Sequence, residues 1–350
     1  MTVTTTLARP TRRAPQAGAL ALLVVCVVAV ACLAVLALLS LTLPTPRVGL
    51  DELVAIARGG GRPLARVVVL ELRLPRLVLG MLAGAMLGLS GALLQTALRN
   101  PLAGPELLGV TSGATIVVAA ITILHLPVLL AVIPWLALAG GLLAGVVVIL
   151  SLGRAHDPVR LVLVGAALTA LLNACVIVLV SYGTQADISI LFLFLVGSLA
   201  NRTWPHVRLI LPWALVCIPL AFALARSLNV LQLGEHVARG LGMPVGRVRV
   251  AILVLAVALV AGVVAVCGPI AFVALLAPHL TRRLLRSTDA RLVLPATALS
   301  GAVLLTTADL LAHTLFDPME LPVGLWTTLL GGPLLLVLLQ RQLSARRGDA

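Results

Sequence analysis

Ten apolar runs, most of them close to 20 residues or longer, follow one another along this chain of 350 residues. A helix needs about 20 apolar residues to cross the ~30 Å hydrocarbon core of a bilayer. Because 61% of the residues are hydrophobic and only 11% are charged, one water-soluble core cannot bury them all. The sequence therefore predicts an all-α, polytopic membrane protein with about ten transmembrane helices. It excludes a soluble enzyme or a nucleic-acid-binding module. The runs are 17–43, 67–98, 107–126, 128–152, 159–182, 207–225, 248–267, 270–285, 292–316 and 321–339.

One membrane domain, 17–340, fills the chain between two short tails, 1–16 and 341–350. The first run follows three arginines, as a signal peptide does, but its 27 residues without a charge exceed the 7–15 apolar residues of a signal segment. We therefore interpret it as a helix. A further apolar run, 188–199, is too short to cross a bilayer and is a candidate re-entrant segment.

The arginines predict the orientation, because basic residues favour the cytoplasmic loops. With the N-terminus inside, 17 of the 25 basic residues lie in cytoplasmic segments, and both Arg-rich tails are cytoplasmic with ten crossings. The aromatic residues that favour the membrane–water interface, Trp135, Tyr182, Trp204 and Trp326, lie near the expected outer ends. The segment from Arg47 to Arg76 departs from this pattern, since it places six arginines outside. We expect a multi-pass protein of the bacterial cytoplasmic (inner) membrane.

The chain contains no lysine, which limits its chemistry. A Walker A loop needs a lysine on the nucleotide phosphates, and a pyridoxal-phosphate enzyme needs one for its Schiff base. The six histidines form no HExxH or other close pair of metal ligands, so we predict no metal site. The sequence thus predicts a protein that is no enzyme and binds no cofactor of its own; ATP and Mg²⁺, if used, bind a separate subunit.

The second apolar run carries a stripe of small residues, Gly80, Gly84, Gly88 and Gly91. Such a stripe lets another helix approach closely, whereas glycine in a lipid-facing helix weakens the helix without any gain in packing. We therefore expect this helix to lie at the centre of the bundle.

Asp309 is a carboxylate deep within an apolar run, which allows two interpretations. A proton-coupled secondary transporter needs such a residue as its proton carrier. Alternatively, Asp309 makes hydrogen bonds between helices, with Thr306, Thr307 or His313 as neighbours. We favour the structural role.

A long cytoplasmic segment, 227–246, is polar enough to leave the membrane and still keeps an apolar face. Residues Leu231, Leu233, Val237 and Leu241 form this face. An amphipathic helix of this kind suits docking to a groove on a partner protein, and it equally suits lying on the membrane surface.

Arg73 and Arg76 stand at the expected outer start of the second helix, in the segment LRLPR. Cations at a helix N-terminus oppose the helix dipole, and on the outer face they also oppose the charge bias of membrane proteins. Because these two arginines oppose both tendencies, we expect them to have a function, namely to bind an acidic partner protein on the outer side. The alternative is that both side chains reach lipid phosphates.

Four ordered segments together resemble the FecCD-type permeases, the membrane subunits of ABC importers for ferric siderophores, haem and cobalamin. They are RLPRLVLGMLAGAMLGLSGALLQTALRNPLAGPELLGVTSGA (73–114), LNVLQLGEHVARGLG (228–242), GPIAFVALLAPHLTRR (268–283) and DLLAHTLFDPMELPVGLWTTLLGGPLLLVLL (309–339). The resemblance extends from about Leu72 to Gln340. It implies the type II, cobalamin-importer-like fold of about ten helices, working as a homo- or heterodimer of permeases with two ATPase subunits inside and a substrate-binding protein outside.

The resemblance also assigns roles to residues. It implies that Arg73 and Arg76 contact the binding protein, and that a coupling loop around 227–246 contacts the ATPase through Leu233, Gly234, Glu235, Ala238, Leu241 and Gly242. A cytoplasmic gate is expected at Asp157, Pro158 and Val159. His313 stands where many members carry an arginine, so it is the expected third docking residue. Where members have GFVGL and GAPFF, this chain has AFVAL (271–275) and GGPLL (331–335).

The sequence thus predicts the permease subunit of an ABC importer, with ferric siderophores as the leading cargo. The rival hypothesis is a proton-coupled secondary transporter that uses Asp309.

Overall fold

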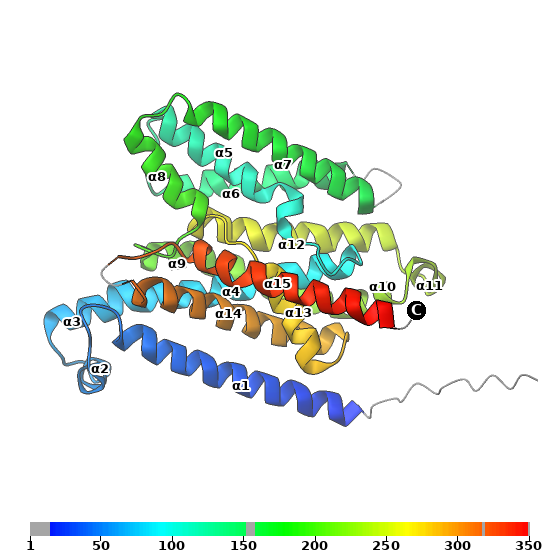
Figure 1. Ribbon diagram of the computed structural model, residues 1–350, viewed down its shortest axis with the longest axis horizontal. Helices are drawn as coiled ribbons and strands as arrows, with labels where there is room; N and C mark the ends of the chain where they lie inside the picture. Colours follow the sequence, from blue (N-terminus) through cyan, green and yellow to red (C-terminus); the bar gives the residue numbers. More distant parts are fainter. Residues whose placement is uncertain (1–14, 152–157, 317–318, 349–350) are drawn as a thin grey trace, which may run out of the picture.

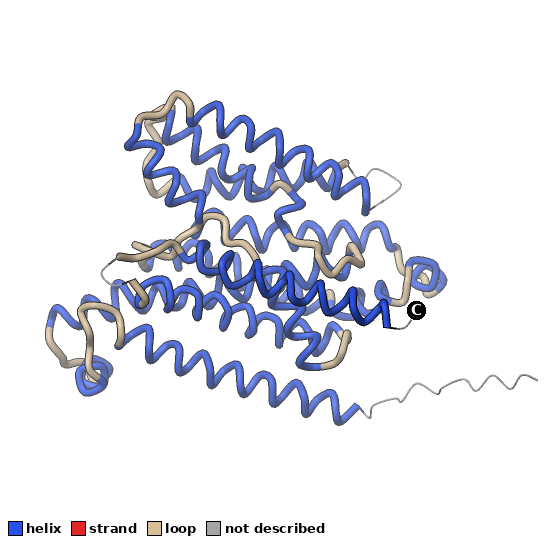
Figure 2. The backbone as a smooth tube through the Cα atoms, viewed as in Figure 1, coloured by secondary structure: helices blue, strands red, loops and turns tan. Residues whose placement is uncertain are grey.

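The computed structural model describes residues 15–151, 158–316 and 319–348, and every regular element among them is a helix (Figure 2). This confirms the predicted all-α fold. In chain order the helices are α1 (Pro15–Thr42), α2 (Leu50–Ala57), α3 (Pro63–Val67), the π-helical η1 (Val68–Arg73), α4 (Leu74–Ala97), the 3₁₀-helical η2 (Pro105–Leu108), α5 (Val110–Ile123), α6 (Ile133–Leu150), α7 (Pro158–Val180), α8 (Gln185–Val196), α9 (Trp204–Ala223), α10 (Ala225–Gln232), α11 (Glu235–Gly240), α12 (Val245–Cys267), α13 (Val273–Leu285), α14 (Ala290–Thr314) and α15 (Val323–Gly348).

Seven helices in the described part of the chain are long and apolar enough to cross a membrane. Each of the ten predicted runs contains a helix, but three of these helices fall short of that length or composition. They are α5, α13 and the apolar part of α15, Val323–Val337. Helix α13 has 13 residues and carries two arginines in its last turn. The run 188–199 corresponds to α8, which has only 12 residues.

The second predicted run, 67–98, overlaps one continuous helical path, Pro63–Ala97, of 35 residues, and extends one residue beyond its end. At 1.5 Å per residue this path is about 52 Å long, well above the ~30 Å of a bilayer core. Its first part, α3, therefore extends beyond the core. The π-helical turn η1 joins α3 to α4.

Helix α4 lies at the centre of the bundle, with α14, α12 and α13 packed around it (Figure 1). The stripe of glycines makes these contacts close. A Cβ atom on Gly84 would overlap the backbone of Gly301 in α14, and one on Gly91 would overlap the Ala274 carbonyl of α13. Gly80 is less crowded, since its nearest neighbour would be the Leu199 side chain at 3.4 Å. Backbones in contact at Gly84 and Gly91 explain why small residues occupy these positions.

Different helices begin and end at the two ends of the bundle (Figure 1). Helix α1 begins and α15 ends at one end, where α10 and α11 also lie; this is the proximal end below. At the opposite, distal end lie α2 and α3, the starts of α4 and α9, and the end of α14. The candidate sites fall at these two ends.

Candidate functional site

A polar pocket of about 190 Å³ lies at the distal end, between α1, α4 and α14. Arg76, on the first turn of α4, binds both carboxylate oxygens of Asp309 on α14, at 3.0–3.2 Å. Its Nη1 donates a further hydrogen bond to Glu320, at 3.0 Å, in the connection from α14 to α15. The side chains of Arg76 and Asp309 are 14% and 7% exposed, whereas that of Glu320 is 48% exposed. Glu320 is thus the one carboxylate of this cluster that an external partner could displace.

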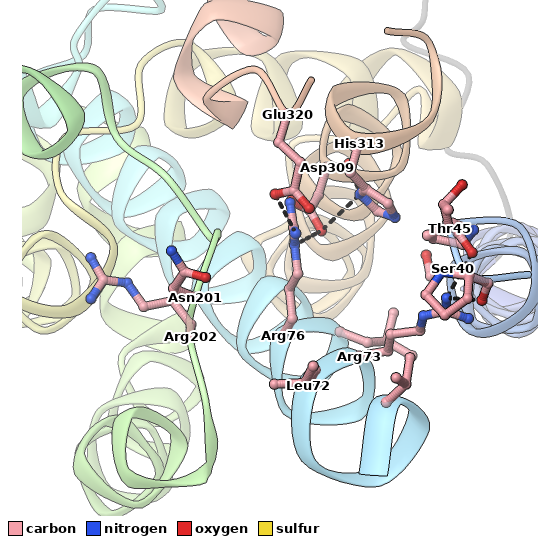
Figure 3. A pocket seen from close by; sticks show the side chains of 14 residues that line it. Ser40, Thr45, Leu72, Arg73, Arg76, Asn201, Arg202, Asp309, His313 and Glu320 are labelled. Carbon is pink, nitrogen blue, oxygen red and sulfur yellow. Dashed lines mark hydrogen bonds and ion pairs between the residues drawn. The ribbon is translucent and has the colours of Figure 1, made fainter. Parts of the chain in front are cut away.

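Arg73 points away from this cluster, toward the end of α1 (Figure 3). Its guanidinium donates hydrogen bonds to the carbonyl oxygens of Leu41, Pro44 and Pro46, at 2.6–2.7 Å. The residue is only 8% exposed. These three bonds, one to the last turn of α1 and two to the loop after it, hold this segment against η1.

His313 and Arg202 complete the wall of the pocket. His313 lies one turn beyond Asp309 on α14, is 7% exposed, and has its Nδ1 at 3.8 Å from the Asp309 carboxylate. The guanidinium of Arg202 points away from Arg76, and its Nη1 lies 3.2 Å from Nε2 of His206 (Figure 3). Of the three predicted docking residues, Arg73, Arg76 and His313, none presents a fully exposed charge, because each is packed or paired within the chain.

The predicted coupling loop forms α10 and α11 at the proximal end. Gly234 and Gly242 flank α11, and both have a positive φ, of 105° and 79°, which suits glycine. Glu235 begins α11 and accepts hydrogen bonds from Arg239, at 3.0 Å, and from the buried Arg249 of α12. The bond from Arg249, followed by the charges of the neighbouring arginines, holds the pKa of Glu235 below its ordinary value. The pair fixes α11 to the start of α12.

An apolar stripe on this loop faces away from the protein. Leu233, Val237 and Leu241 are 60%, 50% and 65% exposed, and they are spaced four residues apart. On the opposite side, Ala238 is fully buried. Of the predicted coupling residues, Leu233 and Leu241 are therefore available to a partner, while Ala238 packs inward.

The predicted gate is only partly visible. Asp157 lies outside the described residues, Pro158 begins α7, and Val159 is 63% exposed.

The family model of the FecCD transport family matches residues 32–341. The chain belongs to the FecCD transport family. Among curated relatives, this FecCD chain is 41% identical over 279 residues to the Fe(3+) dicitrate transport system permease protein FecD of Escherichia coli (strain K12). That alignment covers 78% of this chain and 85% of the relative. It is also 42% identical over 288 residues to the hemin transport system permease protein HmuU of Yersinia pestis, with 80% and 85% covered.

A solved structure supports the same assignment. It is described as an inward-facing conformation of a putative metal-chelate type ABC transporter, and it matches with a TM-score of 0.79 at 29% identity. The match covers 89% of this chain and 97% of the other. The FecCD chain is therefore a permease subunit of an ABC importer, a transport component.

Sequence reasoning missed two residues of these sites in the FecCD chain. Glu320 is the exposed partner of Arg76, and the only available signal was an acidic residue in the short segment after the helix that carries Asp309. Arg249 is the buried partner of Glu235, and the signal was an arginine placed within the first turns of an apolar helix. Neither signal identifies the residue with which the side chain pairs.

Proposed function

We propose that this permease imports ferric siderophores across the bacterial cytoplasmic membrane, with its proximal end in the cytoplasm. In this arrangement the chain forms half of a pathway with a second, identical or paralogous permease. Two ATPase subunits, which bind ATP and Mg²⁺, dock at the proximal end, and a substrate-binding protein docks at the distal end. Rocking of the helices opens the pathway to one side and then to the other, and this chain performs no covalent chemistry.

The observation that carries the proposal is the exposed apolar stripe of Leu233, Val237 and Leu241 outside the membrane-spanning helices. An apolar helix face left in water is costly, and burial in a partner's groove removes that cost. The Glu235–Arg249 pair connects this face to α12, one of the two most buried spans, so a push on α11 reaches the bundle core. These features support docking of an ATPase rather than of lipid.

The distal pocket is the proposed docking site for the binding protein, with Arg76 as the residue that meets it. A carboxylate of the binding protein would replace Glu320 on the Arg76 guanidinium, while Asp309 stays in place. Arg73 would hold the loop after α1 in shape, and His313 would pack behind the pair. Charge pairs desolvated in an interface couple by about 1.5–7 kcal/mol, so one such exchange is enough to direct recognition.

Binding of the substrate-loaded binding protein to the reconstituted complex tests the docking site. Glu320→Gln removes the competitor and should tighten binding, whereas Arg76→Gln should weaken it at least about tenfold, or about 1.4 kcal/mol. Glu52→Gln is the matched control, because Glu52 is a distal carboxylate paired with Arg62 away from the pocket. Equal affinity for all variants would reject the docking site and leave the fold assignment untouched.

Ferric siderophores are the proposed cargo because relatives carry iron chelates: their names include Fe(3+) dicitrate and iron(3+)-hydroxamate import as well as hemin transport. Uptake of radiolabelled ferric hydroxamate, ferric citrate, hemin and cobalamin by cells that express the complete importer tests this. We expect uptake of a ferric siderophore. Uptake of hemin or cobalamin alone would contradict the proposed cargo.

A further inference from the structure

A groove between α9 and α12, with a volume of about 660 Å³, is lined almost entirely by apolar side chains. This volume falls within the ~300–1,000 Å³ that is typical of ligand pockets. Trp213 and Leu224 line it from α9 and the residue after it, and Ala251 and Ala258 line it from α12. Both helices are candidate membrane spans, so the groove lies at the depth of the bilayer.

The wall of the groove nearest the membrane centre is fixed by Trp213. Its indole N–H donates a hydrogen bond to the Ala258 carbonyl oxygen, at 2.7 Å. Gly262 leaves room for the ring, since a Cβ there would lie 2.6 Å from the indole. The one indole donor in the lining is therefore already used within the protein, and the groove selects an apolar occupant.

Two arginines lie within about one helical turn of the lining residues at the other, proximal end of the groove. Arg247 precedes Ala251 by four residues on α12, so it continues the groove-lining face of that helix by one turn. Arg226 follows Leu224 by two positions, at the start of α10. Both are exposed, and neither guanidinium has a hydrogen bond or ion pair with any residue in the described part of the chain.

We propose that this groove binds an anionic phospholipid, with one acyl chain between α9 and α12 and the phosphate group on Arg247 and Arg226. The two features require a molecule with an apolar tail and a negative head at membrane-surface depth, and a phospholipid supplies both. Basic residues between transmembrane helices at the membrane surface bind anionic headgroups in this way. A transmembrane helix of another chain would fill the groove but would leave the two guanidinium groups without a counter-charge.

Tryptophan quenching in lipid nanodiscs tests the site on the full chain. The probes are phosphatidylglycerol and phosphatidylcholine that carry bromine on an acyl chain, each titrated into unbrominated phosphatidylcholine. The signal of Trp213 is the difference between the wild-type chain and Trp213→Phe. We expect half-maximal quenching of this signal at about a tenfold lower fraction of phosphatidylglycerol than of phosphatidylcholine, because two arginines near the surface attract the anionic headgroup.

Variants separate the head and tail contributions. Arg226→Gln with Arg247→Gln should bring the two lipids to nearly equal quenching. Arg283→Gln with Arg291→Gln, which removes two exposed proximal arginines from α13 and α14, should keep the preference. Ala251→Phe, which fills the groove, should lower quenching by both lipids. Native mass spectrometry of the same variants gives a second measurement should Trp213→Phe not fold, and we expect a retained anionic lipid in the wild type that the first double variant loses.

Three results would overturn the proposal. Equal quenching of the wild type by both lipids would show that Trp213 contacts bulk lipid only and that the groove has no preference for an anionic lipid. Loss of the preference in both double variants indicates a general surface charge effect. Absence of quenching by either lipid, with dimers in the nanodisc, indicates that a second copy of the chain covers the groove.

Discussion

Arg76 and Asp309, 233 residues apart in the sequence, form a bidentate ion pair at 3.0 Å between α4 and α14. The pair lies where the two most extensively packed helices of the bundle meet at the distal end. It gives the intramembrane aspartate a fixed cationic partner. This arrangement favours the structural interpretation of Asp309 over a proton carrier.

The ion pair should contribute to stability as a unit. Removing one partner of a buried pair costs about 3–5 kcal/mol, because the other charge is left uncompensated. For Asp309→Asn we expect a smaller loss of stability than this, since Arg76 keeps Glu320 as a partner. For Arg76→Gln we expect the larger loss of stability. The double variant should be destabilised by about 0.5–3 kcal/mol less than the sum of the two single variants. Unfolding midpoints of the purified variants in one detergent measure the coupling.

The half-exposed Glu320 provides the control for this prediction. Glu320→Gln should lower stability by no more than about 1 kcal/mol, as for exposed pairs. Strict additivity of the Arg76 and Asp309 variants would contradict the pair's role. Asp309→Asn should also retain most uptake; a folded but inactive variant would favour the proton-carrier hypothesis.

The glycine stripe should tolerate a methyl group at one position and not at another. A Cβ on Gly84 would lie 2.8 Å from Cα of Ala302 and closer still to the Gly301 carbonyl, so α4 and α14 must move apart. A Cβ on Gly80 would meet two side chains and no backbone atom, Leu199 at 3.4 Å and Thr306 at 3.9 Å. We expect Gly84→Ala to cost about 1–3 kcal/mol, as overpacking does, and Gly80→Ala to be nearly neutral. Equal unfolding midpoints for the two variants would argue against the close approach.

The coupling loop should depend on its backbone geometry. Gly242 has a φ of 79°, which a side chain rarely adopts, whereas a Cβ on Gly240 would meet open space. Gly242→Ala should therefore strain the end of α11, by about 1 kcal/mol or more, and weaken stimulation of the ATPase by the binding protein. Gly240→Ala, the matched control, should leave stimulation unchanged. Insertion of both variants should be normal, since the loop lies outside the spans. Wild-type stimulation by Gly242→Ala and by the harsher Gly242→Pro would contradict the coupling role.

Acid should release α11 from α12. The hydrogen bond from Arg249 lowers the pKa of Glu235 in the folded protein below its ordinary value of 4.5. A group with a lowered folded pKa stabilises the protein fully above its unfolded pKa, and this contribution is lost as the pH falls through the folded value. The difference in unfolding midpoint between the wild type and Glu235→Gln should therefore be constant from about pH 8 to about pH 5 and shrink below pH 4.5. A difference that shrinks already near neutral pH would contradict the pairing.

The pattern of apolar runs was sufficient to place a helix in each of the ten runs, because hydropathy is a local property of the sequence. The glycine spacing likewise predicted a central helix, and the alternation of polar and apolar residues around Glu235 predicted an amphipathic helix outside the membrane. Each of these features is a pattern within a single helix, so it can be recognised in the sequence without knowledge of how the helices pack.

The partners of the charged residues could not be predicted in this way. Arg76 meets Asp309 only because α4 and α14 pack side by side, and no local pattern specifies that contact. The position of Arg73 at the start of an outer helix predicted a docking role, but it gave no indication of the residues that Arg73 contacts in the structure. Its guanidinium donates hydrogen bonds to three carbonyl groups, one in the last turn of α1 and two in the loop that follows. A buried arginine that bonds to its own chain and an exposed docking arginine look alike in a sequence.

ATP-driven import is the central claim, and transport by the reconstituted importer tests it most directly. Proteoliposomes that contain this permease, its ATPase and the binding protein would be supplied with a radiolabelled ferric siderophore, with and without ATP and with and without a proton ionophore. The account predicts uptake that requires ATP hydrolysis and continues in the presence of the ionophore. Uptake that the ionophore abolishes, and that proceeds without ATP, would contradict it.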